Sequence, residues 1–177
     1  AFSIMKRIVI SAILTLLFTL SARAGYDFEV DGIYYRIISL SEMTCAVVDS
    51  GENDTASTGY YNVSKDYNGD VVIPDEVSFK GMTLRVTKVE KGAFFGSGIK
   101  TLVIGANVRE IGEYATWNCS ISSVFIMPGR HSLAVGRYGL IGNEIRIGRS
   151  IVYKDLYSSF TSIVFEDTVK EVPAGSS

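Results

Sequence analysis

The chain of 177 residues is long enough for one domain with a hydrophobic core. It carries 17 basic and 19 acidic residues, and because three of the basic residues lie among the first 24, the remainder has 14 basic against 19 acidic residues, a net charge of about −5. Proteins that bind nucleic acid or an anionic membrane through charge need a surplus of lysine and arginine, so this composition argues against both partners.

Residues 5–24 have the three parts of a secretory signal peptide. Met5, taken as the start, is followed by Lys6 and Arg7, then by an apolar run over 8–20 and by the small-residue cleavage motif Ala-Arg-Ala at 22–24. The run is shorter than the ~18 residues that a spanning helix needs, which favours cleavage over a retained anchor. We therefore predict that 1–24 is a signal peptide and that the protein is exported, with no stable membrane insertion after cleavage.

The next segment has the pattern of β-strands. Residues 28–35 predict a hairpin, with Asp31 and Gly32 as its turn, and Cys45 begins an apolar, strand-like run over 45–48. Cys45 and Cys119 are the only cysteines, and an even count in an exported chain permits a disulfide. Their places in apolar strand positions favour two buried thiols instead.

A polar stretch follows, and it offers oxygen ligands for calcium. These are Asp49, Glu52, Asp54, Asp66 and Asp70. Their spacing lacks the alternating ligands and the distal glutamate of an EF-hand, so we favour a solvated loop over a metal site.

A period of 22 residues begins at Val86. Six apolar residues recur at this offset: Val86, Val89, Ala93, Ile99, Leu102 and Ile104 are followed by Val108, Ile111, Ala115, Ile121, Val124 and Ile126. The same internal spacing returns at Phe160, 39 residues beyond the second copy, which predicts an insertion around 127–159. Each copy contains a short strand and a return segment, and it buries its inner face only against stacked neighbours.

These copies carry a resemblance to a known family. Residues 86–94 and 108–115 resemble the BspA-type leucine-rich repeat, 67–86 resemble the lead-in that precedes the first repeat, and 28–35 resemble the family's capping hairpin. The resemblance implies a mainly β leucine-rich-repeat solenoid with an amino-terminal β-hairpin cap. Residues 25–85 would form the cap and the lead-in hairpin, and 86–177 the repeats, interrupted around 127–159.

The sequence stops at a particular point of the repeat. Gly175 and Ser176 align with Gly92 and Ala93, just before the next return segment. Since a solenoid normally ends in a polar cap, we expect either a piece of a longer repeat protein or a final strand left as an exposed edge.

The residues needed for catalysis are scarce. His131 is the only histidine, and the adjacent Ser132 would point to the opposite face of a strand, so the two do not form a base and nucleophile pair. Cys45, Cys119 and His131 lack the close pairs that a zinc site uses. We predict that the chain is not an enzyme and that it holds no catalytic residues, no cofactor and no metal.

The outward positions of the repeat strands form the candidate protein-binding face. Stacking would align them in two rows, one of small hydroxyl-bearing residues and one apolar. The candidates are Thr101, Val103, Ser123, Phe125, Ser162 and Val164. An uncovered apolar row favours a protein partner. The alternative is that the predicted insertion folds over the row and covers it.

The resemblance implies a function as well. Proteins of this type are surface-exposed or secreted in bacteria and are associated with adhesion to host proteins or to other cells. We expect a non-enzymatic binding module on the outer face of a bacterial envelope or released from it, with an unidentified protein partner. The alternatives are a spacer or truncated fragment with no ligand of its own, and a hydrolase or calcium-dependent module that would need an acidic pair in a cleft.

Overall fold

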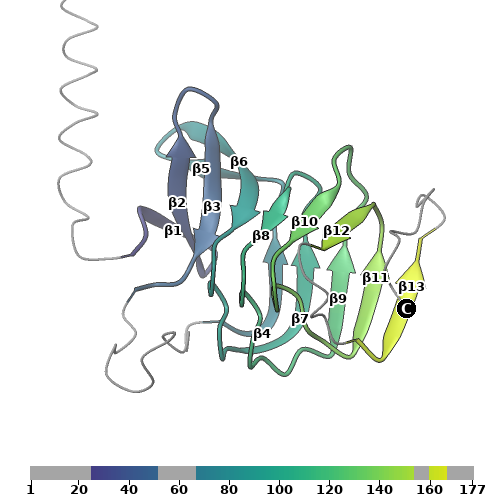
Figure 1. Cartoon of the computed structure of the whole chain (residues 1–177). Helices are drawn as coiled ribbons and strands as arrows, with labels where there is room; N and C mark the ends of the chain where they lie inside the picture. Colours follow the sequence, from purple (N-terminus) through teal and green to yellow (C-terminus); the bar gives the residue numbers. More distant parts are fainter. Residues whose placement is uncertain (1–24, 52–66, 154–159, 167–177) are drawn as a thin grey trace, which may run out of the picture.

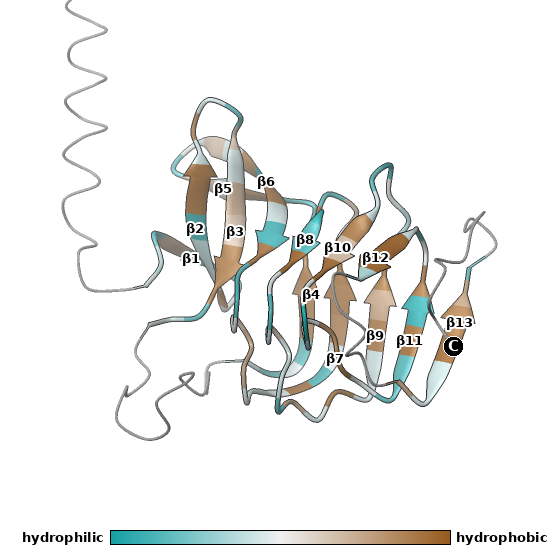
Figure 2. Ribbon diagram, in the orientation of Figure 1, coloured by the Kyte–Doolittle hydropathy of each residue, from teal (hydrophilic) through white to brown (hydrophobic). Residues whose placement is uncertain are grey.

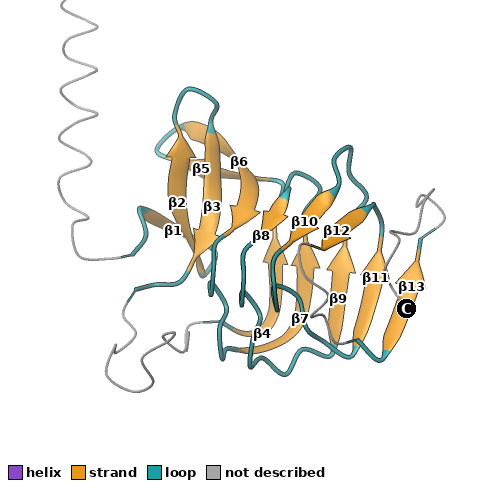
Figure 3. Cartoon of the chain, in the orientation of Figure 1, coloured by secondary structure: helices purple, strands orange, loops and turns teal. Residues whose placement is uncertain are grey.

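The computed structural model describes residues 25–51, 67–153 and 160–166. Within these ranges the chain forms thirteen β-strands and no helix, as Figure 3 shows. The prediction of a mainly β chain is therefore confirmed. The predicted signal peptide at 1–24, and Glu52, Asp54 and Asp66 of the calcium hypothesis, lie outside the described residues.

Eight strands form the first sheet. They are β1 (Phe28–Val30), β2 (Ile33–Ser39), β3 (Thr44–Val48), β5 (Glu76–Phe79), β6 (Met82–Val89), β8 (Glu110–Ile111), β10 (Leu133–Val135) and β12 (Ile151–Tyr153). The order is β1-β2-β3-β6-β8-β10-β12, and β5 pairs with β6. The pairs β1–β2, β2–β3 and β5–β6 are antiparallel, while every pair from β3–β6 onward to β12 is parallel.

Five strands form the second sheet, and all of its pairs are parallel. They are β4 (Asn68–Ile73), β7 (Gly98–Ile104), β9 (Ser123–Ile126), β11 (Glu144–Ile147) and β13 (Ser162–Phe165). Their order is β4-β7-β9-β11-β13, so each strand lies beside the next one of the same sheet along the chain.

From β6 onward the chain alternates between the two sheets (Figure 1). Each pass through both sheets, which we call a coil, returns the chain beside the strand that it left. Alternate side chains point inward, so Leu102, Val124 and Ile145 of the second sheet are fully buried, as are Val89 and Val135 of the first. These residues belong to one hydrophobic core between the sheets.

The predicted insertion around 127–159 is wrong for the part that the structure describes, 127–153. This segment contains β10 and β12 of the first sheet and β11 of the second, so it continues the coils. Ser123 pairs with Glu144, 21 positions later, and Glu144 pairs with Ser162, 18 positions later. The gap of 39 residues is therefore one coil of 21 and one of 18, and a search at a constant period of 22 does not detect coils of changing length.

Turns between the sheets are filled by side chains or brought close by glycine. Phe94 is fully buried in the first turn, with its ring edge-on to Tyr67 at a centroid distance of 4.8 Å. Thr116 occupies the equivalent place in the next coil, where it is also buried and its Oγ1 accepts a hydrogen bond of 2.8 Å from the backbone N–H of Ile141. A Cβ added to Gly112 would lie 2.5 Å from the backbone nitrogen of Lys91, so this coil packs on the preceding one through bare backbone.

A buried arginine joins the later coils to an earlier turn. The Arg149 side chain is 4% exposed, and its guanidinium donates hydrogen bonds to the carbonyl oxygens of Gly105 (3.0 Å), Val108 (2.7 Å) and Ala106. Burial lowers the pKa of this guanidinium from its ordinary value, and the carboxylate of Asp75 acts in the opposite direction. These three bonds compensate the loss of hydration that a buried cation suffers.

The hairpin at the amino-terminal end agrees with its sequence signal. Asp31 and Gly32 both have positive φ, 52° and 76°, as a two-residue turn between twisted strands requires. The hairpin packs through Phe28, whose ring stacks on Phe79 of β5 at 4.3 Å and on Tyr35 at 5.2 Å.

Candidate protein-binding face

The outer face of the second sheet follows from the alternation of its strands. In β7, Leu102 and Ile104 are fully buried, so Thr101 and Val103 between them point outward. The parallel register places Thr101 beside Ser123 and Val103 beside Phe125. The outward residues of neighbouring strands therefore align in rows across the sheet.

Each row has five members, one from every strand. The polar row consists of Asp70, Thr101, Ser123, Glu144 and Ser162. The second row, which we call the Phe125 row, consists of Val72, Val103, Phe125, Arg146 and Val164. The structure thus places the six predicted residues in two rows, but separates the residues of β9 from those of β13 by one strand.

Sequence reasoning missed four members of this face, Asp70, Val72, Glu144 and Arg146. Asp70 and Val72 belong to the lead-in, which was assigned to the cap, although β4 pairs in parallel with β7 like any repeat strand. Glu144 and Arg146 fell in the supposed insertion. The signal that would have found them is the pair Ile145 and Ile147, which matches Val124 and Ile126 at an offset of 21.

A charged pair lies beside the aromatic residue of the face. The guanidinium carbon of Arg146 lies 5.5 Å from the centre of the Phe125 ring, within cation–π range. Its Nε donates a 2.8 Å hydrogen bond to Glu144, which raises the pKa of Arg146. In Figure 2, β11 stands out as a hydrophilic strand among mainly hydrophobic neighbours. The Phe125 row is therefore apolar on both sides of one arginine.

Segment 127–153 does not cover this face, because its strands lie within the two sheets. Val72 is 56% exposed and Val164 is 38% exposed, whereas Val103 and Phe125 are half-buried. The ends of the Phe125 row are thus open to solvent, and its middle is open in part.

Both cysteines are free thiols in the structure. Cys45 lies in β3 with no exposed surface, and burial raises the pKa of its thiol to about 12. Cys119 is half-buried, its Sγ donates to the carbonyl oxygen of Phe94 at 2.9 Å, and burial raises its pKa as well. The expectation of two thiols without a disulfide agrees with the structure.

The residues considered for catalysis and metal binding do not converge. Both His131 and Ser132 are exposed, and Asp49 and Asp70 are the members of the calcium hypothesis that the structure describes. In the ranges described, no three histidine, cysteine or acidic side chains group as metal ligands would. Those ranges also hold no helix with the length and apolar character to cross a membrane.

Comparisons with known proteins identify the fold. No family model matches the chain, and no curated protein matches it. A crystal structure of a leucine-rich repeat protein from Bacteroides capillosus ATCC 29799 is similar, with a TM-score of 0.52 and 16% identity over 81% of this chain and 99% of that one. A leucine rich cell surface protein from Faecalibacterium prausnitzii A2-165 gives a TM-score of 0.49 and 17% identity, over 84% of this chain and 44% of that one.

The likeness to the Bacteroides protein shows that this chain has a leucine-rich-repeat fold. It confirms the resemblance to leucine-rich repeat proteins that the 22-residue period indicated. The chain spans less than half of the Faecalibacterium protein.

Proposed function

We propose that the chain is a non-enzymatic protein-binding module that acts through the outer face of its five-stranded sheet. The observation that carries this proposal is the Phe125 row, which crosses all five strands in register and is 56% exposed at Val72 and 38% at Val164. Apolar side chains flanked by a polar row have the composition of a protein interface with a polar rim.

The same proposal includes an architecture. The two sheets would be the walls of a leucine-rich-repeat solenoid, supported by the alternation of the chain between them. Residues 25–85 would form its amino-terminal cap and lead-in hairpin, and 86–177 its repeats. The antiparallel pairs that give way to parallel ones at β3 support this division.

Export to the cell surface or the medium is the second part of the proposal. It is supported by the charged, apolar and small-residue parts of 5–24. Mass spectrometry of the protein recovered from the envelope and the medium should find a mature chain that begins at Gly25. A mature chain that retains Lys6 and Arg7 would contradict cleavage at this position.

The size of the face indicates how it would bind. Five strands at ~4.8 Å spacing and about six residues in length give a surface of roughly 400 Å². A stable complex usually buries about 800 Å² on each partner. One copy would therefore bind weakly, and adhesion would depend on several copies or on further contacts that raise the effective concentration.

The test is binding of purified residues 25–177 to a panel of host matrix and plasma proteins, with a Phe125→Asp variant measured beside the unchanged protein. We expect saturable binding that weakens at least about tenfold in the variant, because a charge replaces the ring at the centre of the face.

Val152→Asp is the matched control. Val152 is 53% exposed and lies on the eight-stranded sheet, so this variant carries the same charge on the other wall. Circular dichroism would establish that both variants fold. Failure of the folded, unchanged protein to bind any member of the panel would favour the spacer hypothesis, and equal losses in both variants would exclude the Phe125 row as the binding surface.

A further inference from the structure

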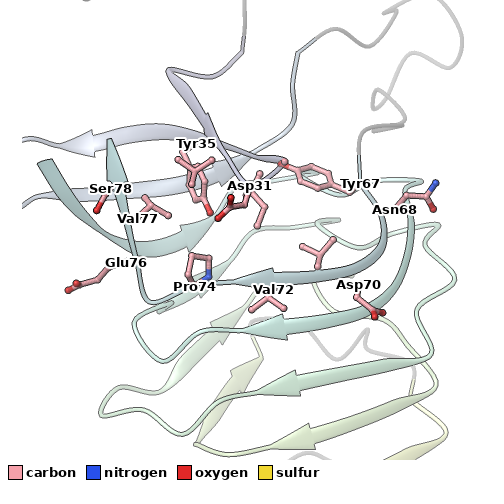
Figure 4. Close-up of a pocket in the computed structure, with 14 residues that line it drawn as sticks. Asp31, Tyr35, Tyr67, Asn68, Asp70, Val72, Pro74, Glu76, Val77 and Ser78 are labelled. Atoms are coloured by element: carbon pink, nitrogen blue, oxygen red, sulfur yellow. The ribbon is translucent and has the colours of Figure 1, made fainter. Parts of the chain in front are cut away.

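A groove lies at the amino-terminal end of the second sheet, away from the centre of the Phe125 row. Its volume is about 680 Å³, and Figure 4 shows its walls. One wall is the β1–β2 hairpin with Asp31 and Tyr35, another is β4, and the third is the start of β5 with Glu76 and Val77.

Two unpaired strand edges open onto this groove. β4 ends the five-stranded sheet and pairs only with β7 among the described strands, while β5 pairs only with β6. The carbonyl of Tyr67 accepts a 3.0 Å hydrogen bond from the N–H of Gly98 on the β7 side. Because backbone groups alternate between the two edges of a strand, Asn68, Asp70 and Val72 direct their N–H and C=O groups to the open edge.

The groove is acidic as well as apolar. Asp31, Asp70 and Glu76 line it, and no lysine or arginine side chain does. No cation in the described part of the chain forms an ion pair with any of the three. Arg85 lies opposite Glu76 in the β5–β6 pair, but its guanidinium donates to the carbonyl oxygen of Glu42 at 3.0 Å.

We propose that this groove binds an extended, cationic peptide segment of a partner protein, which adds to β4 as a further strand. The open edge would supply main-chain hydrogen bonds, and the side chains of the groove would supply selectivity. In an added strand, one outward residue lies beside Asp70 and another beside Val72, so a basic and an apolar side chain two positions apart would fit. This site does not depend on the proposed role of the Phe125 row.

Pro74 sets the length of the segment. Proline has no N–H and therefore closes one end of the edge to strand pairing. The pairing region is then 68–72, and a strand of five residues extends over about 17 Å. A segment of five or six residues should consequently reach full affinity, and longer peptides should gain little.

The experiment measures the fluorescence anisotropy of a labelled hexapeptide of alternating lysine and valine with the purified protein at physiological salt. Two further hexapeptides carry N-methyl groups, one on every lysine amide and the other on every valine amide. We expect one of these peptides to bind at least about tenfold more weakly and the other to bind within about threefold of the parent, since only one set of amides faces β4. A hexapeptide of glutamate and valine should not bind.

Asp70→Asn and Glu113→Gln form the matched pair of variants. Each removes one negative charge from an exposed residue, but Glu113 lies outside the groove and pairs with Lys91. We expect about three- to tenfold weaker binding in Asp70→Asn and no change in Glu113→Gln.

Four results would overturn the proposal. They are the absence of binding, an equal loss with both methylated peptides, an equal loss in both variants, and a stable dimer in light scattering that the hexapeptide dissociates. The second and third would indicate attraction by net charge alone, and the last would show that a second copy of this chain occupies the edge of β4.

Discussion

Arg149 is the one charged residue that the described part of the chain buries below a tenth of its surface. Its guanidinium supplies the hydrogen bonds for three carbonyl oxygens in the turn at 105–108. A shorter or neutral side chain leaves these acceptors without a donor in a place that water does not reach freely. The residue therefore stabilises the fold through the backbone, independently of any ion pair.

Replacement of Arg149 by Met should lower the free energy of unfolding by about 3 kcal/mol, because similar volume remains while three buried acceptors lose their donor. Urea unfolding followed by the fluorescence of Trp117, the only tryptophan, would measure the change. Arg130→Met is the control, since Arg130 is exposed and should change stability by less than about 0.5 kcal/mol. Equal effects of the two substitutions would contradict the assigned role.

Cys45 should make stability fall at alkaline pH. Its pKa is about 12 in the fold against an ordinary value of 9.0, so above pH 9 the unfolded chain loses a proton that the folded chain keeps. The contribution of this thiol is complete below pH 9, and it declines as pH rises from 9 toward 12, by up to about 1.4 kcal/mol per pH unit.

The measurement is the free energy of unfolding between pH 8 and 10, under reducing conditions, for the unchanged protein and for Cys45→Ala. Part of the decline above pH 9 should disappear in the variant. Burial also raises the pKa of Tyr35, which would contribute above pH 10, so the comparison stops there. Identical slopes for the two proteins would argue that Cys45 ionises as readily in the fold as outside it.

At the scale of single residues, the sequence predicted the face in part. Thr101, Val103, Ser123 and Phe125 lie where the 22-residue offset places them, on adjacent strands. Arg146 could not be found in this way, because a charged residue within a strand breaks the apolar pattern that marks a repeat. The three acceptors of Arg149 were equally out of reach, since they lie 41 to 44 positions earlier and no local spacing connects them.

At the scale of the elements, coil contacts at glycine limit which sequences this fold accepts. A Cβ at Gly112 would meet the backbone nitrogen of Lys91 at 2.5 Å and its Cα at 2.8 Å. Backbone cannot move aside as a flexible side chain can, so a methyl group here forces two successive coils apart.

Gly112→Ala should therefore cost about 2 kcal/mol or more in the free energy of unfolding. Gly81 gives the comparison: an added Cβ there has open space but a φ of 78°, so Gly81→Ala should cost about 1 kcal/mol from backbone strain alone. Urea titration of both variants tests the order of the two effects. A smaller loss in Gly112→Ala than in Gly81→Ala would contradict the close approach of the coils.

The strands themselves were largely predictable. Alternating apolar residues gave β7 and β9, and the Asp31 and Gly32 turn gave the β1–β2 hairpin, because both signals are local. Coil length is not local: the turns at 127–143 and 148–161 differ in how many residues return the chain to its sheet. A fixed period therefore predicted the first coils and misassigned β10, β11 and β12.

At the scale of the whole molecule, the parallel sheets make stability a sum over neighbouring strands. β9 has strand partners on both sides, β7 and β11. β13 pairs only with β11 among the described strands, and all four of its residues are exposed, including Ile163 at 45% and Phe165 at 40%.

Amide hydrogen exchange should reflect this difference. We expect the amides of β13 to exchange about a hundredfold faster than those of β9, because a strand with one partner opens without disrupting the core. Mass spectrometry of peptides that cover 123–126 and 162–165 would compare the two strands. Equal protection would indicate that all the coils unfold together as one cooperative unit.

The position of Arg149 has a consequence for the synthesis of the chain. The carbonyl oxygens that it binds belong to residues made 41 to 44 positions earlier. At about 5 to 20 residues per second, roughly 2 to 9 seconds pass between the translation of that turn and that of Arg149. During this interval water must hydrate the turn, so a nascent chain completes its first coils only after the ribosome has made the strands that follow them.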